Sequence, residues 1–323
     1  MDEVNVKATA HIGVRVSGLK PWAWRGRGYV LVVTLALLVL AVTLLVSVGR
    51  VAVVRAAAGR EAAEGLQRRW GAVSIRRAVL PYAEPILTGV ERQRGEALAV
   101  YRTGVRLGGQ EFGIVLGDEQ AKANVNALLE DADAGRAAVR LRGAMAGMGV
   151  GNAMVLRPAA VPMLGEVSAS NPAIGGFGQV FDGVPPDKLL GAGGRGGPAE
   201  LLTCWGNGRI NVRRASEAAV RLRADPPLTV VEISRVLSAR DASLGGREGI
   251  RSGDGGPLRG WLGRVLNGAV SREHLGVGAA VLTDGSACHS LWIVTREGQR
   301  ERYSLTVVDE SDPDKPRTSG FVW

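Results

Sequence analysis

The chain has 323 residues, which is enough for one or two folded domains. Its 46 glycines follow no three-residue period, which excludes a collagen-like protein, and its two cysteines and three histidines cannot build a zinc site. The formal net charge of +9 would suit nucleic acid or anionic lipid as a partner, but such a charge is more often that of a solvated, arginine-rich surface.

An apolar segment near the N-terminus is the first element. Residues 29–49 carry no charge, and 21 helical residues span about 31 Å, close to the thickness of a bilayer core. A secretory signal is usually shorter and ends at a small-residue cleavage motif, which does not follow here. The segment therefore predicts a membrane-spanning helix, with residues 29–54 as its membrane part.

The helical pattern continues beyond the apolar segment. Ala63, Leu66, Trp70 and Val73 recur at helical spacing, and no proline occurs between the apolar segment and Pro81. We therefore predict that the membrane helix runs on as a long amphipathic helix.

Short elements follow the helix. Apolar runs broken by glycine predict strands within 98–116, and residues 117–145 switch to helical spacing. Residues 146–198 are rich in glycine, alanine and proline and indicate loops, with a short helix within 177–190. The segment GAGGRGG at 191–197 lacks the flanking strand and helix of a dinucleotide site, so it reads as a loop.

The last third of the chain alternates helices and strands. Two helices are predicted on either side of Pro226 and Pro227, and the second begins with a capping box formed by Thr229 and Glu232. A short helix is predicted at 258–270. Strands are then predicted at 280–285, 288–296 and 300–310, with a hairpin turn at Glu297-Gly298 and the last residues at a sheet edge.

Two segments of the chain echo one another. Each has a turn, a residue of strand type and then Asn-Val. The first contains Asn124 and Asn126, and the second contains Asn211, with Arg213 in place of the second asparagine. Asparagine tolerates turn geometry and is a strong helix N-cap, so such a residue can end a strand and start a helix.

The start of the chain resembles the class III signal of type IV pilins and type II secretion pseudopilins. In that signal a basic leader ends in glycine and precedes a long hydrophobic helix, and the matching site here is Gly28–Tyr29. The resemblance implies that a prepilin peptidase removes residues 1–28 and methylates Tyr29. Most pilins have Glu at the fifth mature residue. Val33 stands there instead, as is usual in the minor pseudopilins called general secretion pathway protein K.

The order of later motifs resembles the same family. An acidic pair before an Asn-x-Asn segment is matched by Asp118, Glu119, Asn124 and Asn126, and a second asparagine segment by Asn211. Over residues 25–323 this resemblance implies an α+β fold, in which a long N-terminal transmembrane helix packs on a small antiparallel sheet. It also implies an inserted helical domain of helix-hairpin-helix or SAM-like type. The expected pilin-like part comprises residues 55–117 and 280–323, and the expected insert residues 118–279.

The resemblance implies a structural function, that of a minor pseudopilin at the tip of the type II secretion pseudopilus. Such a subunit helps to initiate or cap assembly for protein export across the outer membrane. Its expected partners are other minor pseudopilins, the pseudopilus, the prepilin peptidase and the membrane, with no nucleic acid. It would cross the bacterial inner membrane once, with its C-terminal domain in the periplasm. No pattern typical of a catalytic site occurs in the sequence, so neither enzymatic activity nor a cofactor is expected.

DNA binding by a membrane-anchored helix-hairpin-helix protein is the alternative. Arginines around the two predicted helices could contact phosphates. Two prolines in the turn argue against this, because proline lacks the backbone N–H that a DNA-binding hairpin presents. Arg213 and Arg214 also replace the family's Asn-Thr, so that Ser216 is expected to cap the helix one turn later. The arginines in question are Arg213, Arg214, Arg221, Arg223, Arg235 and Arg240.

Two further sites are expected. Cys204 and Cys288 could form a disulfide if this part of the chain lies outside the cytoplasm, on neighbouring strands that flank the insert. Calcium is the one possible ligand, because carboxylates close together in a loop suit it. The loop in question contains Asp309, Glu310, Asp312 and Asp314.

Overall fold

The protein is described here by a computed structural model that covers residues 27–131, 134–157, 174–191, 196–224, 228–245, 257–297 and 300–323. Its contacts divide the chain into two compact units, Met1–Glu64 and Gly65–Trp323. Most of the predicted leader lies outside the described residues, and the predicted cleavage site Gly28–Tyr29 lies in the first turn of a helix.

Helix α1 spans Arg27–Val79 without interruption, as the sequence predicts. All described side chains from Tyr29 to Glu64 are exposed. By length and composition alone, one helical stretch of the described chain, Tyr29–Arg94, is apolar enough to cross a membrane. Pro81 follows α1 within a 3-10 turn, η1 (Leu80–Tyr82), and α2 (Ala83–Arg94) ends at Gly95, whose φ of 75° is the left-handed conformation that glycine adopts without strain.

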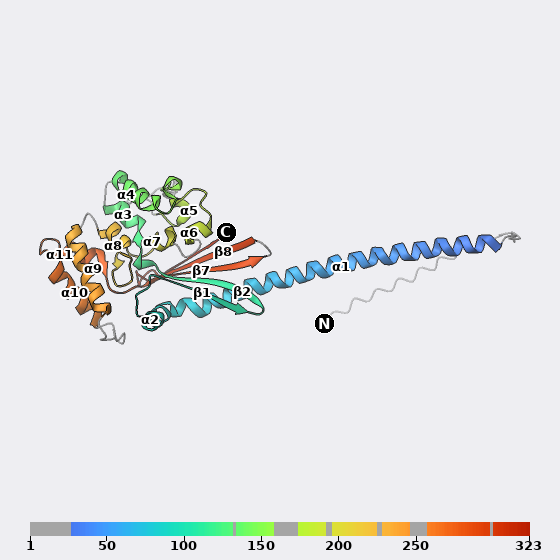
Figure 1. The fold of residues 1–323 in the computed structure, drawn as a ribbon, viewed down its shortest axis with the longest axis horizontal. Coiled ribbons are helices and arrows are strands. Elements are labelled where there is room, and N and C mark those ends of the chain that lie inside the picture. Colours follow the sequence, from blue (N-terminus) through green and yellow to red (C-terminus); the bar gives the residue numbers. More distant parts are fainter. Residues whose placement is uncertain are drawn as a thin grey trace, which may run out of the picture. The chain divides into compact units, whose positions relative to one another are not determined.

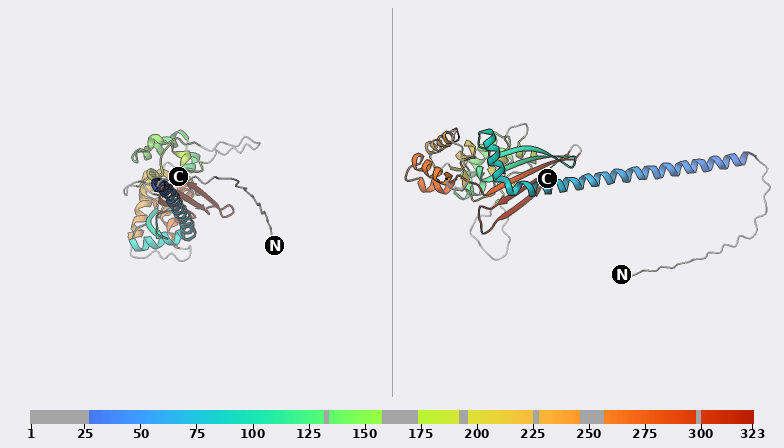
Figure 2. Two further views of the ribbon diagram at one scale, coloured as in Figure 1. Left: turned by 90° about the vertical axis from the view of Figure 1, so that its right-hand side faces the viewer. Right: turned by 90° about the horizontal axis from the view of Figure 1, so that it is seen from below.

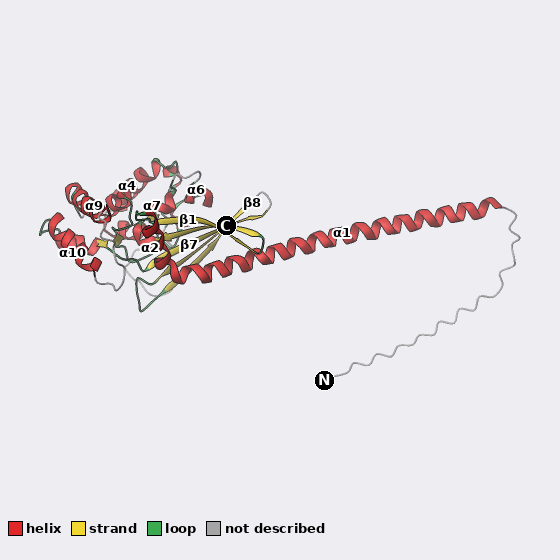
Figure 3. Ribbon diagram, turned by 60° about the horizontal axis from the view of Figure 1, so that its bottom comes forward, coloured by secondary structure: helices red, strands yellow, loops and turns green. Residues whose placement is uncertain are grey.

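Five strands form one antiparallel sheet in the order β1-β2-β7-β8-β9. Strands β1, β7 and β8 of this sheet are labelled in Figures 1 and 3. The strands are β1 (Val100–Leu107), β2 (Gln110–Asp118), β7 (Cys288–Glu297), β8 (Arg300–Asp309) and β9 (Arg317–Val322). The long helix and this sheet confirm the predicted α+β class, and β9 occupies an edge as expected. The predicted hairpin turn is bracketed by the pair Glu297 and Arg300, and its central residues 298 and 299 lie outside the described part of the chain.

The sheet has an apolar core on each face. Alternate residues of β2, namely Phe112, Ile114 and Leu116, are buried with Leu87 of α2 in one core. Val115 of β2 belongs to the other core, as the period of two along a strand requires. The central strands β2 and β7 are therefore buried on both faces. Helices α1 and α2 contribute to the core on one face, and the helices between β2 and β7 contribute to the core on the other.

Within the second unit, the end of α1 packs against the sheet through a face of small residues. Gly71 is buried, and a Cβ atom there would overlap the ring of Phe112. Arg68 on the same side forms an ion pair of 2.6 Å with Glu297. Leu66 and Trp70, in contrast, are 57% and 61% exposed. The apolar stripe identified in the sequence is thus real, but it lies opposite the face that packs on the sheet.

The segment between β2 and β7 is mainly helical. Its helices gather around one end and one face of the strands (Figures 1 and 2) and contribute most of the second core. Two short parallel pairs, β3–β4 and β5–β6, tie this segment together. The elements are η2 (Glu119–Ala121), β3 (Ala123–Asn124), α3 (Val125–Asp131), α4 (Ala134–Ala146), η3 (Gly151–Ala153), α5 (Phe177–Val180), α6 (Pro186–Leu190), α7 (Pro198–Leu201), β4 (Leu202–Thr203), β5 (Ile210–Asn211), α8 (Glu217–Ala224), α9 (Val230–Gly245), α10 (Pro257–Ala269), α11 (Leu275–Val281) and β6 (Leu282–Thr283).

The predicted helices in this segment are confirmed, but one predicted strand is mostly wrong. Helix α11 continues to Val281, so that the strand expected at 280–285 is reduced to Leu282–Thr283 beside β5. The capping box of α9 is present, because Glu232 N donates to Thr229 Oγ1 at 3.3 Å and Thr229 N donates to Glu232 Oε2 at 2.9 Å. The turn at Pro226 and Pro227 lies outside the described residues. The boundaries predicted for the inserted domain stay a prediction.

Candidate functional site: a buried polar junction

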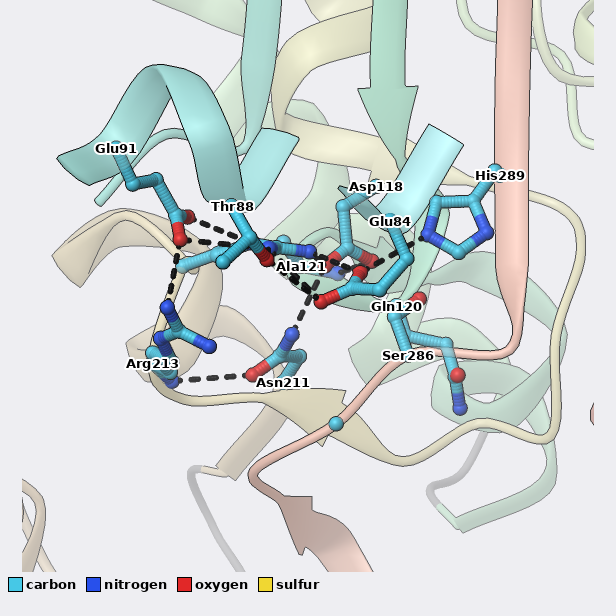
Figure 4. Close-up of polar contacts among 12 residues, drawn as sticks. Glu84, Thr88, Glu91, Asp118, Gln120, Ala121, Asn211, Arg213, Ser286 and His289 are labelled. Atoms are coloured by element: carbon cyan, nitrogen blue, oxygen red, sulfur yellow. Dashed lines mark hydrogen bonds and ion pairs between the residues drawn. The ribbon is translucent and has the colours of Figure 1, made fainter. Parts of the chain in front are cut away.

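A cluster of charged and polar side chains fills the space where α2, the end of β2 and the end of β5 meet (Figure 4). We call this cluster the junction. On α2, the side chains that enter it follow the helical repeat of three and four residues and so share one face. The junction consists of Glu84, Thr88 and Glu91 on α2, Asp118 at the end of β2, and Asn211, Arg213 and Arg214 at and after β5.

Arg214 is the centre of the junction. Its Nε donates to Glu91 Oε1 at 2.6 Å, and its Nη1 lies 2.5 Å from Glu84 Oε2. The same Nη1 lies 3.3 Å from Asp118 Oδ2, and Nη2 donates to Thr88 Oγ1 at 3.0 Å. The side chain is only 1% exposed. A buried guanidinium of this kind is stable only while its carboxylate partners stay in place.

Arg213 adds a second cation to the same helix. Its Nη2 donates to Glu91 Oε2 at 2.7 Å, so both oxygens of this carboxylate accept from arginine. The three carboxylates Glu84, Glu91 and Asp118 thus face two guanidinium groups, and Glu84 also contacts His289 Nε2 at 3.3 Å. Charge is nearly balanced inside the junction, which is the condition for burying it.

Asp118 and Asn211 join the two asparagine-containing segments that echo one another in the sequence. Asn211 Nδ2 donates to Asp118 Oδ2 at 2.8 Å, while Asp118 Oδ1 accepts from Ala121 N and so caps η2. Asn211 Oδ1 accepts from Arg213 N rather than from a helix. Helix α8 is capped instead by Ser216, whose Oγ accepts from Ala219 N at 3.1 Å, as expected.

The first asparagine segment behaves as predicted at Asn124. Its Oδ1 accepts from Ala127 N in the first turn of α3, and its Nδ2 donates to Trp205 O at 2.7 Å. Asn126 reaches a different part of the fold, where it donates to the carbonyl oxygens of Ile174 and Cys204. Each asparagine therefore forms hydrogen bonds with backbone groups that lie far from it in the sequence.

Glu119 forms a second buried polar group next to the junction. Its Oε2 accepts from Thr203 Oγ1 at 2.5 Å, and its Oε1 accepts from Ser290 Oγ at 2.5 Å. Lys122 pairs with Glu119 and is 2% exposed. The Glu119 carboxylate therefore has partners on β4, on β7 and in its own turn. These contacts fix the segment after β2 against the sheet.

The contacts of the junction are those of a structural clamp. It holds α2, β2 and β5 together through charge-assisted hydrogen bonds, which are stronger than neutral ones. Of the residues predicted from the sequence, Asp118 and Asn211 are brought together with Arg213 and Arg214, and Glu119 lies next to them. Asn124 and Asn126 instead contact the backbone of residues 204–206 and Ile174. Glu84 and Glu91 are not predicted from the sequence, because carboxylates spaced along a helix are typical of an ordinary solvated face.

Comparisons with known proteins find a weak structural likeness. A scan against protein-family models finds no match, and a search of the curated proteins finds none. Among solved structures, a chain in the crystal structure of the GspK-GspI-GspJ complex from the type 2 secretion system of enterotoxigenic Escherichia coli is similar. The match has 14% sequence identity and a TM-score of 0.44, and it covers 82% of this chain and 98% of that chain. This likeness is too distant to assign a function.

The arginines considered for DNA binding are mostly engaged inside the protein. Arg213, Arg214 and Arg223 are buried. Arg223 donates to Gly208 O and Arg240 to Ala215 O, both at 2.7 Å. Arg221 pairs with Glu217 on the same helix. A guanidinium that is buried on a carboxylate or a carbonyl cannot also neutralise a phosphate, so this arrangement weighs against the DNA-binding alternative.

Both cysteines are buried and free in the structure. Cys204 directly follows β4, which pairs with β3, whereas Cys288 begins β7 between β2 and β8. The two strands are therefore not paired neighbours, contrary to the expectation. Burial raises the pKa of each thiol above its usual value, and the Glu119 carboxylate adds to this. The disulfide stays a prediction.

The predicted calcium loop lies in the described part of the chain. Asp309 Oδ2 accepts from Gly206 N at 2.9 Å, and its Oδ1 accepts from Ser311. Asp312 Oδ1 accepts from Asp314 N. Among the described residues, no three His, Cys, Asp or Glu side chains gather closely enough to hold a metal ion. Asp309 and Asp312 form hydrogen bonds within the turn before β9, and calcium binding stays a prediction.

The junction makes the protein sensitive to acid through Glu84. Burial alone would raise the pKa of this carboxyl, but hydrogen bonds from His289 and Arg214 outweigh it and lower the pKa from 4.5 to about 2. Because the pKa of Glu84 is lower in the folded state than in the unfolded state, this carboxylate stabilises the folded state at pH values above 4.5. The stabilisation is lost as the pH falls from 4.5 towards 2. We expect Glu84→Gln to be less stable than the wild type at pH 7 in urea unfolding, and the difference to shrink at pH 3. An equal difference at both pH values would contradict this.

Proposed function

We propose that the chain is a minor pseudopilin of a type II secretion pseudopilus, placed at its tip, where it helps to start or cap assembly for export across the outer membrane. Helix α1 is the observation that carries the proposal. It is uninterrupted over Arg27–Val79, and its apolar side chains from Tyr29 to Val54 are exposed. Such a helix needs lipid or other helices around it, and a pilin-like subunit exchanges the first for the second.

The tip position is supported by the residue at position 33. A carboxylate at the fifth mature residue could pair with the N-terminal amine of a neighbouring subunit, and Val33 cannot. A subunit that lacks this group is suited to the end of an assembly rather than to its repeating part. The large helical segment between β2 and β7 also suits a cap, because a bulky folded part would obstruct the addition of a further subunit above it.

The remaining parts of the proposal follow from this assignment. The chain would be anchored once in the bacterial inner membrane, with residues beyond the apolar segment in the periplasm. Its partners would be other minor pseudopilins, and a prepilin peptidase would process it. We propose a role in assembly for the chain and none in catalysis.

Processing of the N-terminus tests the proposal. In cells with an active prepilin peptidase, the mature chain is expected to begin at Tyr29 with a methylated amine, as measured by intact mass and N-terminal sequencing of protein purified from membranes. Gly28→Val should block cleavage, because the leader would no longer end in glycine. Gly26→Val is the matched control, since it changes a nearby glycine and should still be cleaved. A chain that keeps residues 1–28 in such cells would overturn the proposal.

A further inference from the structure

Strand β1 is an open edge of the five-stranded sheet. It pairs with β2 on one side only, over the 8 residues from Val100 to Leu107. Ala99 O accepts from Asp118 N at the start of the same ladder, so the odd-numbered residues are the ones that bond to β2. The even-numbered residues therefore direct their main-chain N–H and C=O groups away from the sheet. These residues are Val100, Arg102, Gly104 and Arg106.

The outward main-chain groups of β1 are open to a further strand. Among the described residues, none forms a hydrogen bond with the outward N–H and C=O groups of these four. Residues 102–109 are all exposed. Natural sheets usually protect such an edge with proline, lysine or a bulge, and β1 contains none of these. An unprotected edge of this length is a template to which an extended peptide can pair.

A cavity adjoins this edge where β1 begins. Its volume is about 630 Å³, and residues 95–100 line one side of it. Gly197 and Glu200 at α7, Ser216 and Ala218 at the start of α8 and Arg240 on α9 line the rest. A strand that pairs antiparallel with β1 runs towards Val100, so its C-terminal end would enter this cavity. The edge and the cavity are therefore continuous at Val100.

The side chains of β1 indicate which segment fits the edge. Val105 is 39% exposed, and Arg106 lies on the opposite face of the strand. Arg102 already pairs with Glu200. Arg106 has Glu111 opposite it on β2 but forms no ion pair with any described residue. Cross-strand pairs therefore favour an apolar residue beside Val105 and a carboxylate beside Arg106.

We propose that β1 binds an extended segment of another protein by antiparallel strand addition, with the C-terminal end of the segment in the cavity. The segment alternates apolar residues on the face of Val105 with polar residues, one of them a carboxylate opposite Arg106. A second copy of β1 is a poor occupant. An antiparallel pair centred on Gly104 would place Arg102 of each copy opposite Arg106 of the other. The inference does not depend on the proposed function.

Peptide binding to the full-length chain in neutral detergent, followed by fluorescence anisotropy, tests this inference. The probe is fluorescein-labelled Thr-Glu-Val-Ser-Val-Glu-Val-Thr, whose glutamates have the spacing of Arg102 and Arg106. We expect saturable binding that Gly104→Pro weakens about tenfold, because proline removes an outward N–H and its ring obstructs an added strand. An added Cβ at Gly104 meets no atom closer than 3.8 Å, so the change spares the ladder to β2.

Gly320→Pro is the matched control. Tyr303 and Trp323 exchange main-chain hydrogen bonds in the ladder between β8 and β9, so Gly320 directs its N–H to the free edge of β9. An added Cβ there meets no atom within 4 Å. This variant should bind the probe as the wild type does. An equal loss in both variants, or a wild-type chain that shows no saturable binding, would overturn the inference.

Two N-methylated probes separate main-chain pairing from side-chain adhesion on the wild-type chain. N-methyl groups on the glutamates and serine block the N–H groups that face β1, whereas N-methyl groups on the valines block those that face away. Only the first probe should lose affinity, by about tenfold. Equal affinity of the two probes contradicts strand addition. A dimer that Gly104→Pro dissociates would place a second copy at β1 and refute the inference as well.

A longer probe tests the part played by the cavity. Two alanines added at its C-terminus should tighten binding, because they would lie in the cavity beyond Val100. Ala218→Trp should remove this gain, since an exposed alanine that lines the cavity is replaced by a side chain that fills it. An extension that brings no gain, or a gain that survives Ala218→Trp, shows that the segment does not end in the cavity.

Discussion

Arg214→Ala is expected to lower the free energy of unfolding of the second compact unit by about 3–5 kcal/mol. The change removes the cation that separates Glu84, Glu91 and Asp118, and it leaves the buried carboxylates of Glu91 and Asp118 beside the partly exposed carboxylate of Glu84. Thr88 also loses the guanidinium that donates to its hydroxyl. Removing one partner of a buried ion pair is costly because the remaining charges are poorly solvated. Glu91 keeps Arg213 as its single cation, and Asp118 keeps the amide of Asn211 but no cation.

Chemical denaturation of the full-length chain in neutral detergent, followed by circular dichroism, measures this loss. Arg221→Ala is the matched control, because its guanidinium pairs with Glu217 one helical turn away and both side chains are well exposed. Exposed pairs of this kind contribute about 0.3–0.5 kcal/mol. If the two variants lose the same stability, the junction is not the clamp described here.

Lys122→Met should also lower the free energy of unfolding by about 3–5 kcal/mol. It removes the positive charge beside Glu119, a carboxylate that is 1% exposed and keeps only the hydroxyl groups of Thr203 and Ser290 as partners. Two neutral donors stabilise a buried anion less than an ammonium group does.

The double variant Lys122→Met with Glu119→Gln separates charge from packing. Glutamine keeps an acceptor for the hydroxyl groups but carries no charge, so the double variant should be more stable than Lys122→Met by about 1–3 kcal/mol. The corresponding double change at the exposed pair, Arg221→Met with Glu217→Gln, should show little coupling. A double variant that is as unstable as Lys122→Met would show that the loss comes from packing instead.

Local signals in the sequence predicted the elements well. The run without proline up to Pro81 set the length of α1, and the Thr229–Glu232 box set the start of α9. Asn124 and Ser216 cap helices where their chemistry suggested it. These predictions succeed because each depends on residues within a few positions of one another.

The junction and the orientation of α1 depend on contacts that the sequence does not display. Glu91 and Arg214 are 123 residues apart, and nothing near either one indicates the other. For α1, the period of apolar residues identified a stripe but not the face that packs. Small residues at Gly71 and beside it let the sheet approach closely, so the bulkier stripe was left outside. The strand expected at 280–285 was lost because α11 extends into it.

The positions at which the chain leaves and rejoins the sheet are neighbours. Asp118, the last residue of β2, lies opposite His289 at the start of β7. The segment between them therefore begins and ends at one residue pair of the sheet. Its length does not affect the register of β2 and β7. A short hairpin could replace it without shifting any strand pair. Evolution or an engineer could likewise exchange this region as a cassette, provided that the replacement supplied new counter-ions for the two carboxylates left behind on α2.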